Sequence, residues 1–277
     1  MSVAGSRRQT AGSTKLIRLA RVLFLLPAAC FLLSLTCSRQ TSFLERSVVV
    51  NGRIYKYRVW LPPHYSKVHR WPVVLYLHGS AERGDDNVRQ LSNGLPVALP
   101  KYSDRYKTVV VIPQCAYGQE WYGDQETQAL AALDKSIVEF RGDRRRLYLT
   151  GISLGGAGTW YMARHRRWAA VIPVCGEVSR QPNDPFPSDP PPDLARIVGS
   201  PDPFGTLADA IGNTPVWMFH GSEDREIPVT QSRAMFAAFR ARGWNARYTE
   251  YKGIGHQIWD ETYADEELVH WMLKQRR

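Results

Sequence analysis

The stretch 147–156 constrains the fold more than any other part of this sequence. An apolar run ends there in the pattern Gly-x-Ser-x-Gly, and residues 160–167 favour a helix after it. A strand that turns sharply into a helix leaves the turn residue, here Ser153, exposed above the edge of the sheet. Glycine is needed at Gly151 and Gly155 because so tight a turn has no room for side chains. The stretch therefore predicts strand, turn and helix; a Gly-rich connector with a solvent-exposed serine is the alternative.

Further apolar runs of strand length alternate along the chain with segments of helical character. Such runs are typical of parallel strands that are buried on both faces. The expected strands are 73–77, 108–113, 169–175, 215–219 and 246–251, and the expected helices are 125–140, 230–242 and 261–275, with one weak helical patch near 87–95. Before them, 47–61 predicts an antiparallel hairpin that turns at Asn51-Gly52. Strands alternating with helices predict an α/β fold with a mostly parallel sheet and helices on both faces.

The first 40 residues have the composition of a targeting segment. Six of the 36 Lys and Arg residues lie there, with no acidic residue, and the uncharged apolar run 22–37 follows the basic part. That run is short for a membrane span and Pro27 interrupts it, so a secretory signal peptide is favoured over a membrane anchor. A lipoprotein acylated at Cys37 is a further alternative. We expect 1–40 to be a signal or membrane-targeting segment and 41–277 to be one domain, located outside the cell or in its envelope.

Charge, cysteine content and the absence of ligand-binding motifs argue against a nucleic-acid partner, a cofactor and a metal. Beyond residue 40 the chain carries 30 basic against 26 acidic side chains, so the formal net charge of +10 reflects mainly the N-terminus and predicts no nucleic-acid partner. Cys115 and Cys175 each end an apolar run and are expected to be buried free thiols. No phosphate-binding loop and no metal-ligand spacing is present, so we expect no cofactor and no metal.

A proline-rich insertion interrupts the alternation of strands and helices at about 177–212. Eight prolines fall within 182–203, a density that does not allow a continuous helix or a central strand. Because the insertion follows a strand that ends at Gly176, it should lie over the carboxyl edge of the sheet, where ligands bind in open α/β folds. The insertion could form a lid or a wall of the pocket, or it could be only a detour of the chain over the surface; the sequence leaves both alternatives open.

Two more residues follow strands in a way that suits them to assist Ser153. A serine hydroxyl needs a base to accept its proton, and His256 follows Gly253 and Gly255 just after the last expected strand. The base needs a carboxylate, and Asp224 follows the strand 215–219, with Glu223 as its rival. Asp260 is too near His256 in sequence to reach its far nitrogen. The order Ser153, Asp224, His256 is the nucleophile–acid–base order of α/β-hydrolases.

Acyl transfer also needs two N–H donors for the negative oxygen of its transition state. We expect the backbone N–H of Leu154, directly after the nucleophile, and that of Ser80, with Ala81 as the second choice. Trp121, Tyr122 and Trp259 are candidates for lining the substrate pocket; ordinary core or rim packing is the alternative.

These motifs together resemble the α/β-hydrolase superfamily, and within it the phospholipase/carboxylesterase-like group related to dienelactone hydrolases and predicted secreted peptidases. The similarity runs over roughly 45–275, through 77–86, 113–115, 121–122, 151–156, 174–176, 220–224 and 255–256. It implies that Ser153, Asp224 and His256 form a catalytic triad. Ala81 departs from the glycine usual in such relatives, and the proline-rich insertion is longer than theirs.

The function expected is a serine esterase that cleaves carboxylic esters through an acyl-enzyme, acting on a small-molecule or polysaccharide-linked ester. A serine peptidase of the prolyl-oligopeptidase type, and a non-catalytic surface-tethered binding module on a hydrolase scaffold, are the alternatives. In each case the N-terminus could tether the protein to a membrane.

Overall fold

The computed structural model describes residues 43–165, 167–179 and 189–277. These residues form an eight-stranded sheet in the order β1-β2-β4-β3-β5-β6-β7-β8, in which β1, β2 and β4 pair antiparallel and the other neighbours pair parallel. The strands are β1 Phe43–Val50, β2 Arg53–Trp60, β3 Trp71–Leu77, β4 Val109–Pro113, β5 Gly142–Ile152, β6 Ala170–Val174, β7 Val216–Gly221 and β8 Ala246–Tyr251. The predicted α/β class is confirmed, and so is the N-terminal hairpin, which turns at Asn51-Gly52 with both residues at positive φ.

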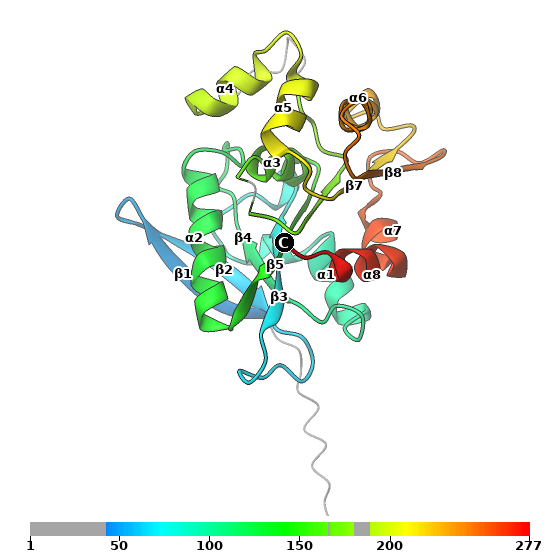
Figure 1. Ribbon diagram of the computed structural model, residues 1–277. Helices are drawn as coiled ribbons and strands as arrows, with labels where there is room; N and C mark the ends of the chain where they lie inside the picture. Colours follow the sequence, from blue (N-terminus) through cyan, green and yellow to red (C-terminus); the bar gives the residue numbers. More distant parts are fainter. Residues whose placement is uncertain (1–42, 166, 180–188) are drawn as a thin grey trace, which may run out of the picture. The chain divides into compact units, whose positions relative to one another are not determined.

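Helices cover both faces of the sheet (Figure 1). They are α1 Leu95–Lys101, α2 Asp124–Glu139, α3 Leu154–Ala163, α4 Pro192–Val198, α5 Pro203–Ile211, α6 Thr230–Ala241, α7 Trp259–Ala264 and α8 Glu266–Lys274. Successive side chains of a strand point to opposite faces, so Val73 and Leu75 of β3 join one core while Val74 and Tyr76 join the other. The first core is packed by α2 to α6, and the second by α1, α7 and α8.

Two of the predicted helices have different bounds in the structure. The weak patch near 87–95 is a 3-10 turn, Arg89–Leu91, and the regular helix α1 begins only at Leu95. The predicted helix 261–275 is divided into α7 and α8 at Asp265, whose backbone is extended and whose side chain accepts the N–H of Glu267 as an N-cap.

The described part of the insertion contains two short helices, which is consistent with a proline density that excludes one continuous helix. Pro192 and Pro203 stand in the first turns of α4 and α5, where a missing N–H costs nothing because no intrahelical partner exists there. Apolar side chains of both helices are buried in the first core: Leu194, Ile197, Leu207, Ala208 and Ile211. The described helices of the insertion, 192–211, therefore pack against the first core, while the prolines at 182, 185 and 187 lie outside the described residues.

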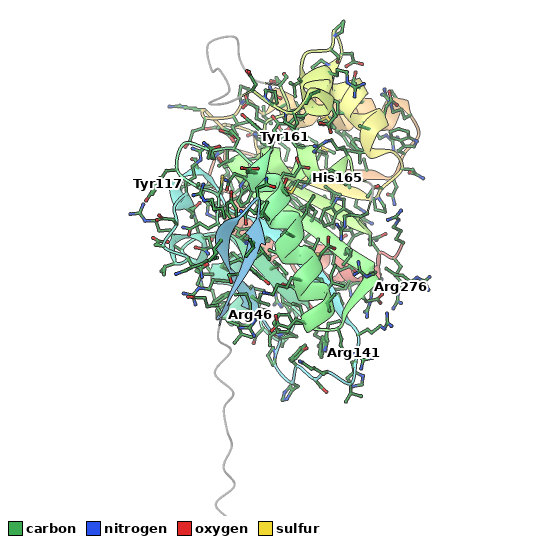
Figure 2. The ribbon with its side chains drawn as sticks, turned by 90° about the vertical axis from the view of Figure 1, so that its left-hand side faces the viewer. Arg46, Tyr117, Arg141, Tyr161, His165 and Arg276 are labelled. Atoms are coloured by element: carbon green, nitrogen blue, oxygen red, sulfur yellow. The ribbon has the colours of Figure 1, made fainter. Side chains whose placement is uncertain are left out.

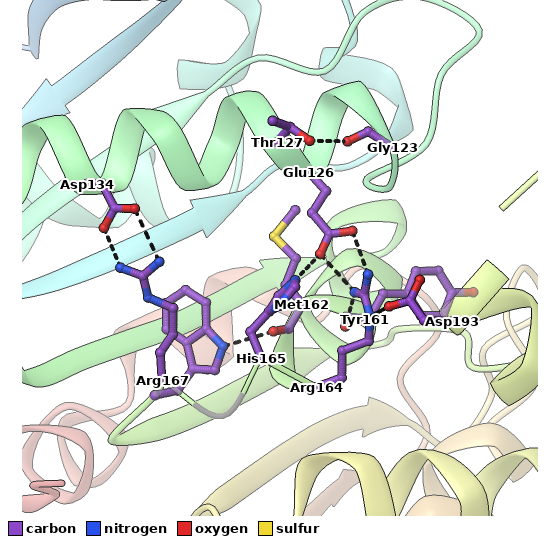
Figure 3. A network of polar contacts seen from close by, with 11 residues as sticks. Gly123, Glu126, Thr127, Asp134, Tyr161, Met162, Arg164, His165, Arg167 and Asp193 are labelled. Atoms are coloured by element: carbon purple, nitrogen blue, oxygen red, sulfur yellow. Dashed lines mark hydrogen bonds and ion pairs between the residues drawn. The ribbon is translucent and has the colours of Figure 1, made fainter. Parts of the chain in front are cut away.

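A network of ion pairs ties the insertion to the helices that cover the first core (Figure 3). The buried guanidinium of Arg164, just after α3, donates to both carboxylate oxygens of Glu126 in α2, at 2.8 and 3.0 Å, and to Asp193 in α4, at 2.7 Å. His165 also contacts Glu126. Figure 2 looks onto the side of the molecule where α2 covers the sheet, and Tyr161 and His165 lie towards the end of α2 that carries Glu126.

The part of the chain that the structure describes includes no helix with both the length and the apolar content needed to cross a membrane. The targeting segment expected in 1–40 lies outside the described residues. A compact unit of the chain runs from Arg39 to Arg277.

Candidate active site

Three side chains from separate loops meet at the carboxyl edge of the parallel strands. Ser153 follows β5, Asp224 follows β7 and His256 follows β8. Nε2 of His256 lies 2.9 Å from Oγ of Ser153, and Nδ1 of His256 lies 2.7 Å from Oδ2 of Asp224. The structure thus brings together the three residues that the sequence grouped.

Ser153 is held at the top of a turn that only small neighbours allow. Its φ of 51° is in the left-handed region, and its N–H donates to the carbonyl of Val174 at 3.0 Å. A Cβ added at Gly155 would lie 2.0 Å from the carbonyl oxygen of Leu77, and one at Gly151 would lie 2.3 Å from the oxygen of Gly155. The tight packing of β3, β5 and α3 therefore requires glycine at both positions, and it aims Oγ of Ser153 away from the sheet.

Asp224 uses both carboxylate oxygens. Oδ1 accepts the backbone N–H groups of Glu226 and Ile227, each at 2.9 Å, and Oδ2 accepts from His256 and lies 3.1 Å from Nε2 of His220. Burial on its own would raise the pKa of Asp224, but these hydrogen bonds outweigh it and hold the pKa well below its ordinary value. Glu223, the rival in the sequence, is exposed and leaves this position to Asp224.

His256 is 9% exposed and lies between a carboxylate and a hydroxyl. Burial opposes its charged form, yet the hydrogen bond to Asp224 prevails and raises the pKa of His256 above 6.5. With Asp224 ionised, the proton of neutral His256 belongs on Nδ1, which leaves Nε2 free to accept from Ser153. Trp259, expected near the pocket, packs its half-buried ring edge-on against the imidazole, with the ring centroids 5.8 Å apart.

Two buried histidines support the site, although the sequence alone did not assign them roles. His220 contacts Asp224 through Nε2, and its Nδ1 lies 2.8 Å from the hydroxyl of Ser232 in α6. His78 donates from Nδ1 to the carbonyl of Gly79 at 2.7 Å and accepts the N–H of Cys115 at Nε2. Burial lowers the pKa of His78 to about 4, so it stays neutral. The sequence signal for His78 was its place directly after β3, beside the predicted donor Ser80.

The two predicted N–H donors both belong to first residues of helices. Leu154 begins α3 and Ser80 begins the 3-10 turn Ser80–Glu82. The backbone N–H at such a position has no partner within its own helix, so both are available to a ligand. Both residues line the same cleft as Ser153.

This cleft has a volume of about 420 Å³. The described residues that line it are Ser80, Arg83, Glu120, Ser153, Leu154, Ala157, Tyr161, Glu177, Glu226, Ile227 and Pro228. Trp121 and Tyr122, expected as pocket residues, are instead 1% and 4% exposed within the first core. Trp121 serves the site indirectly, since its indole N–H donates to the carbonyl of His78 at 3.1 Å.

Cys115 and Cys175 are buried free thiols, as expected. Cys175 has a positive φ of 41° and offers a sulfur within 4.8 Å of ligand atoms of Asp224 and His256. A sequence search for metal-ligand spacing could not find this group, because its members come from three different loops. Burial raises the pKa of Cys175, which keeps the thiol protonated and makes it a poor metal ligand beside two groups already hydrogen-bonded to each other.

Comparison with known proteins gives similarities in sequence and in structure. No protein-family model matches the sequence. An uncharacterized secreted protein of Arthroderma benhamiae is 24% identical over 237 residues, which is 76% of this chain and 24% of that protein. The chain thus spans about a quarter of the length of that relative.

Solved structures of esterases are similar over most of the chain. A thermostable esterase is 27% identical with a TM-score of 0.70, covering 85% of this chain and 63% of that one. A ferulic acid esterase is 19% identical with a TM-score of 0.63, covering 85% and 98%. An S-formylglutathione hydrolase from Staphylococcus aureus is 17% identical with a TM-score of 0.62, covering 84% and 99%.

The chain has the α/β-hydrolase fold, and esterases of that fold are among its structural neighbours. The resemblance noted from the motifs is confirmed at this level.

Proposed function

We propose that this protein is a serine esterase in which Ser153 is the nucleophile, His256 the general base and Asp224 the carboxylate that orients it. The observation that carries the proposal is the continuous hydrogen-bonded series from Oδ2 of Asp224 through His256 to Oγ of Ser153. Similarity to a thermostable esterase at 27% identity supports the same reaction class.

The reaction follows from this arrangement. Oγ of Ser153 attacks the ester carbonyl while its proton passes to Nε2 of His256, and the imidazolium is stabilised by Asp224. The N–H groups of Leu154 and Ser80 receive the negative oxygen of the tetrahedral intermediate. The alcohol leaves with the proton from His256, and a water activated by the same nitrogen then hydrolyses the acyl-enzyme.

The substrate belongs to the carboxylic esters, small or attached to a polysaccharide. Esters of aromatic acids are one class to test, because a ferulic acid esterase is among the structural neighbours. The cleft of about 420 Å³ has room for a group of that size.

Ser153→Ala tests the proposal directly. The variant should lose at least about 10³-fold in kcat on p-nitrophenyl acetate and lose labelling by a fluorophosphonate probe, since no other group replaces the nucleophile. Ser92→Ala, which changes an exposed serine outside the cleft, should keep both. A wild-type protein that neither turns over esters nor takes the label would favour the binding-module alternative, and faster cleavage of a proline-containing peptide than of a short ester would favour the peptidase.

We also propose that 1–40 direct export and that the hydrolase begins near residue 41. The compact unit from Arg39 supports this boundary, and the relative from Arthroderma benhamiae is described as secreted. The intact mass of the exported protein would reveal cleavage, acylation at Cys37 or a retained N-terminus.

A further inference from the structure

The cleft beside Ser153 carries an excess of acidic side chains among its described residues. Glu120, Glu177 and Glu226 line it, together with one guanidinium, that of Arg83. An excess of one charge sign in a cleft sets the potential that a substrate meets on entry. The positions of these groups decide whether the potential reaches the reacting atoms.

Arg83 is held against the wall of the cleft. Its Nη2 lies 2.7 Å from Oε1 of Glu120, and its Nε donates to the carbonyl of Gln119 at 2.7 Å. Both side chains of the pair are largely buried, at 20% and 6% exposure. Because Glu120 balances the charge of Arg83, the guanidinium does not offer an anionic substrate a counterion of its own.

Glu226 stands at the reacting end of the cleft. Its Oε2 lies 3.7 Å from Nε2 of His256, the nitrogen that also contacts Ser153. The backbone of Glu226 is fixed because its N–H donates to Oδ1 of Asp224 at 2.9 Å. Its side chain lines the cleft and is 70% exposed, so the carboxylate is accessible to a substrate in the cleft.

We infer that this cleft selects esters whose acyl and alcohol parts are neutral or cationic, that it rejects anionic esters, and that Glu226 is the residue that determines this selectivity. The inference rests on the proposed esterase function and adds the charge class of its substrate. A carboxylate on the substrate about 6 Å from Glu226 would be repelled by an amount that corresponds to roughly 3- to 10-fold, for effective dielectric constants of about 80 to 40. A quaternary ammonium group at the same distance would gain by a similar factor.

Two matched pairs of esters test the inference, measured as kcat/KM at pH 8 and low ionic strength. p-Nitrophenyl butyrate and the p-nitrophenyl monoester of succinate differ by an anionic charge on the acyl side. 3,3-Dimethylbutyl acetate and acetylcholine differ by a cationic charge on the alcohol side. We expect the succinate ester to be slower than the butyrate by about 3- to 10-fold or more, and acetylcholine to be faster than its neutral counterpart.

Glu226→Gln should narrow the butyrate-to-succinate ratio by about 3- to 10-fold, and 1 M salt should narrow it in the wild type. Glu223→Gln removes the same charge from the same loop outside the cleft and should leave the ratio unchanged. Equal turnover within both pairs, faster turnover of the anionic ester, or an unchanged ratio in Glu226→Gln would overturn the inference while the esterase function stands. Failure to turn over any of the four esters would overturn both.

Discussion

Asp224→Asn separates the two tasks of one carboxylate. Oδ1 of Asp224 accepts two backbone N–H groups of its loop, and Oδ2 faces His256 and His220. An asparagine can keep its oxygen on the two loop N–H groups, which then turns its NH₂ towards His256. An NH₂ donates and cannot accept, so Nδ1 of His256 must become the acceptor and the proton must move to Nε2. Nε2 can then no longer accept the proton of Ser153.

The expected loss in kcat is therefore large while the loss of stability is small. In a serine protease of another fold the same exchange costs about 10⁴-fold, or about 5.4 kcal/mol of transition-state stabilisation. We expect a loss of about 10³- to 10⁴-fold here. The retained loop hydrogen bonds limit the loss in free energy of unfolding to about 1–2 kcal/mol. Initial rates on p-nitrophenyl acetate and urea unfolding measure the two quantities on the same preparation.

Asp265→Asn is the matched control, because Asp265 also accepts a backbone N–H, at 2.8 Å, but caps α8. Asparagine caps helices about as well as aspartate, so both activity and stability should be nearly unchanged. A variant Asp224→Asn that kept more than about a tenth of the wild-type kcat would refute the reasoning, since the tautomer of His256 would then not depend on Asp224.

Two further predictions concern the base and the turn. His256 must be neutral to accept a proton, and the hydrogen bond to Asp224 raises its pKa, so kcat/KM of the wild type should fall as the pH drops through a midpoint above 6.5. The residual activity of Asp224→Asn should fall at a lower pH. A kcat/KM that stays constant at acidic pH would contradict the role of His256. Gly155→Ala should lower the free energy of unfolding by about 3 kcal/mol or more, because the added Cβ would lie 2.0 Å from a backbone oxygen. Gly52→Ala, where nothing lies near the added Cβ, should lower it by only about 1–2 kcal/mol, the cost of a left-handed φ for alanine. Equal losses for the two variants in urea unfolding would contradict the close packing around Gly155.

Much of the fold could be predicted because the sequence is locally consistent with it. The runs 73–77, 109–112 and 147–149 are apolar at every position, as strands covered on both faces must be, and Asn51-Gly52 specifies its own turn. The predicted helices 125–140 and 230–242 agree with α2 and α6 to within one residue at each end.

The remaining features depend on contacts between distant segments. The contacts of His220 with Asp224 and of His78 with Gly79 are pairings that no spacing in the sequence reveals. Trp121 and Tyr122 were candidates for lining the cleft, with core packing as the alternative, and the structure places both in the core. A residue's place near an edge of a sheet does not fix the direction of its side chain.

The two helices of the insertion have a consequence for how this protein can vary. Leu194 and Leu207 are fully buried, and the guanidinium of Arg164 binds both Asp193 of the insertion and Glu126 of α2. Removing the whole segment would uncover apolar surface of the first core, so the folded state tolerates changes in its exposed prolines far better than its loss. The described helices of the insertion thus belong to the hydrophobic interior, and their exposed positions are the ones at which this protein can change at little cost in stability.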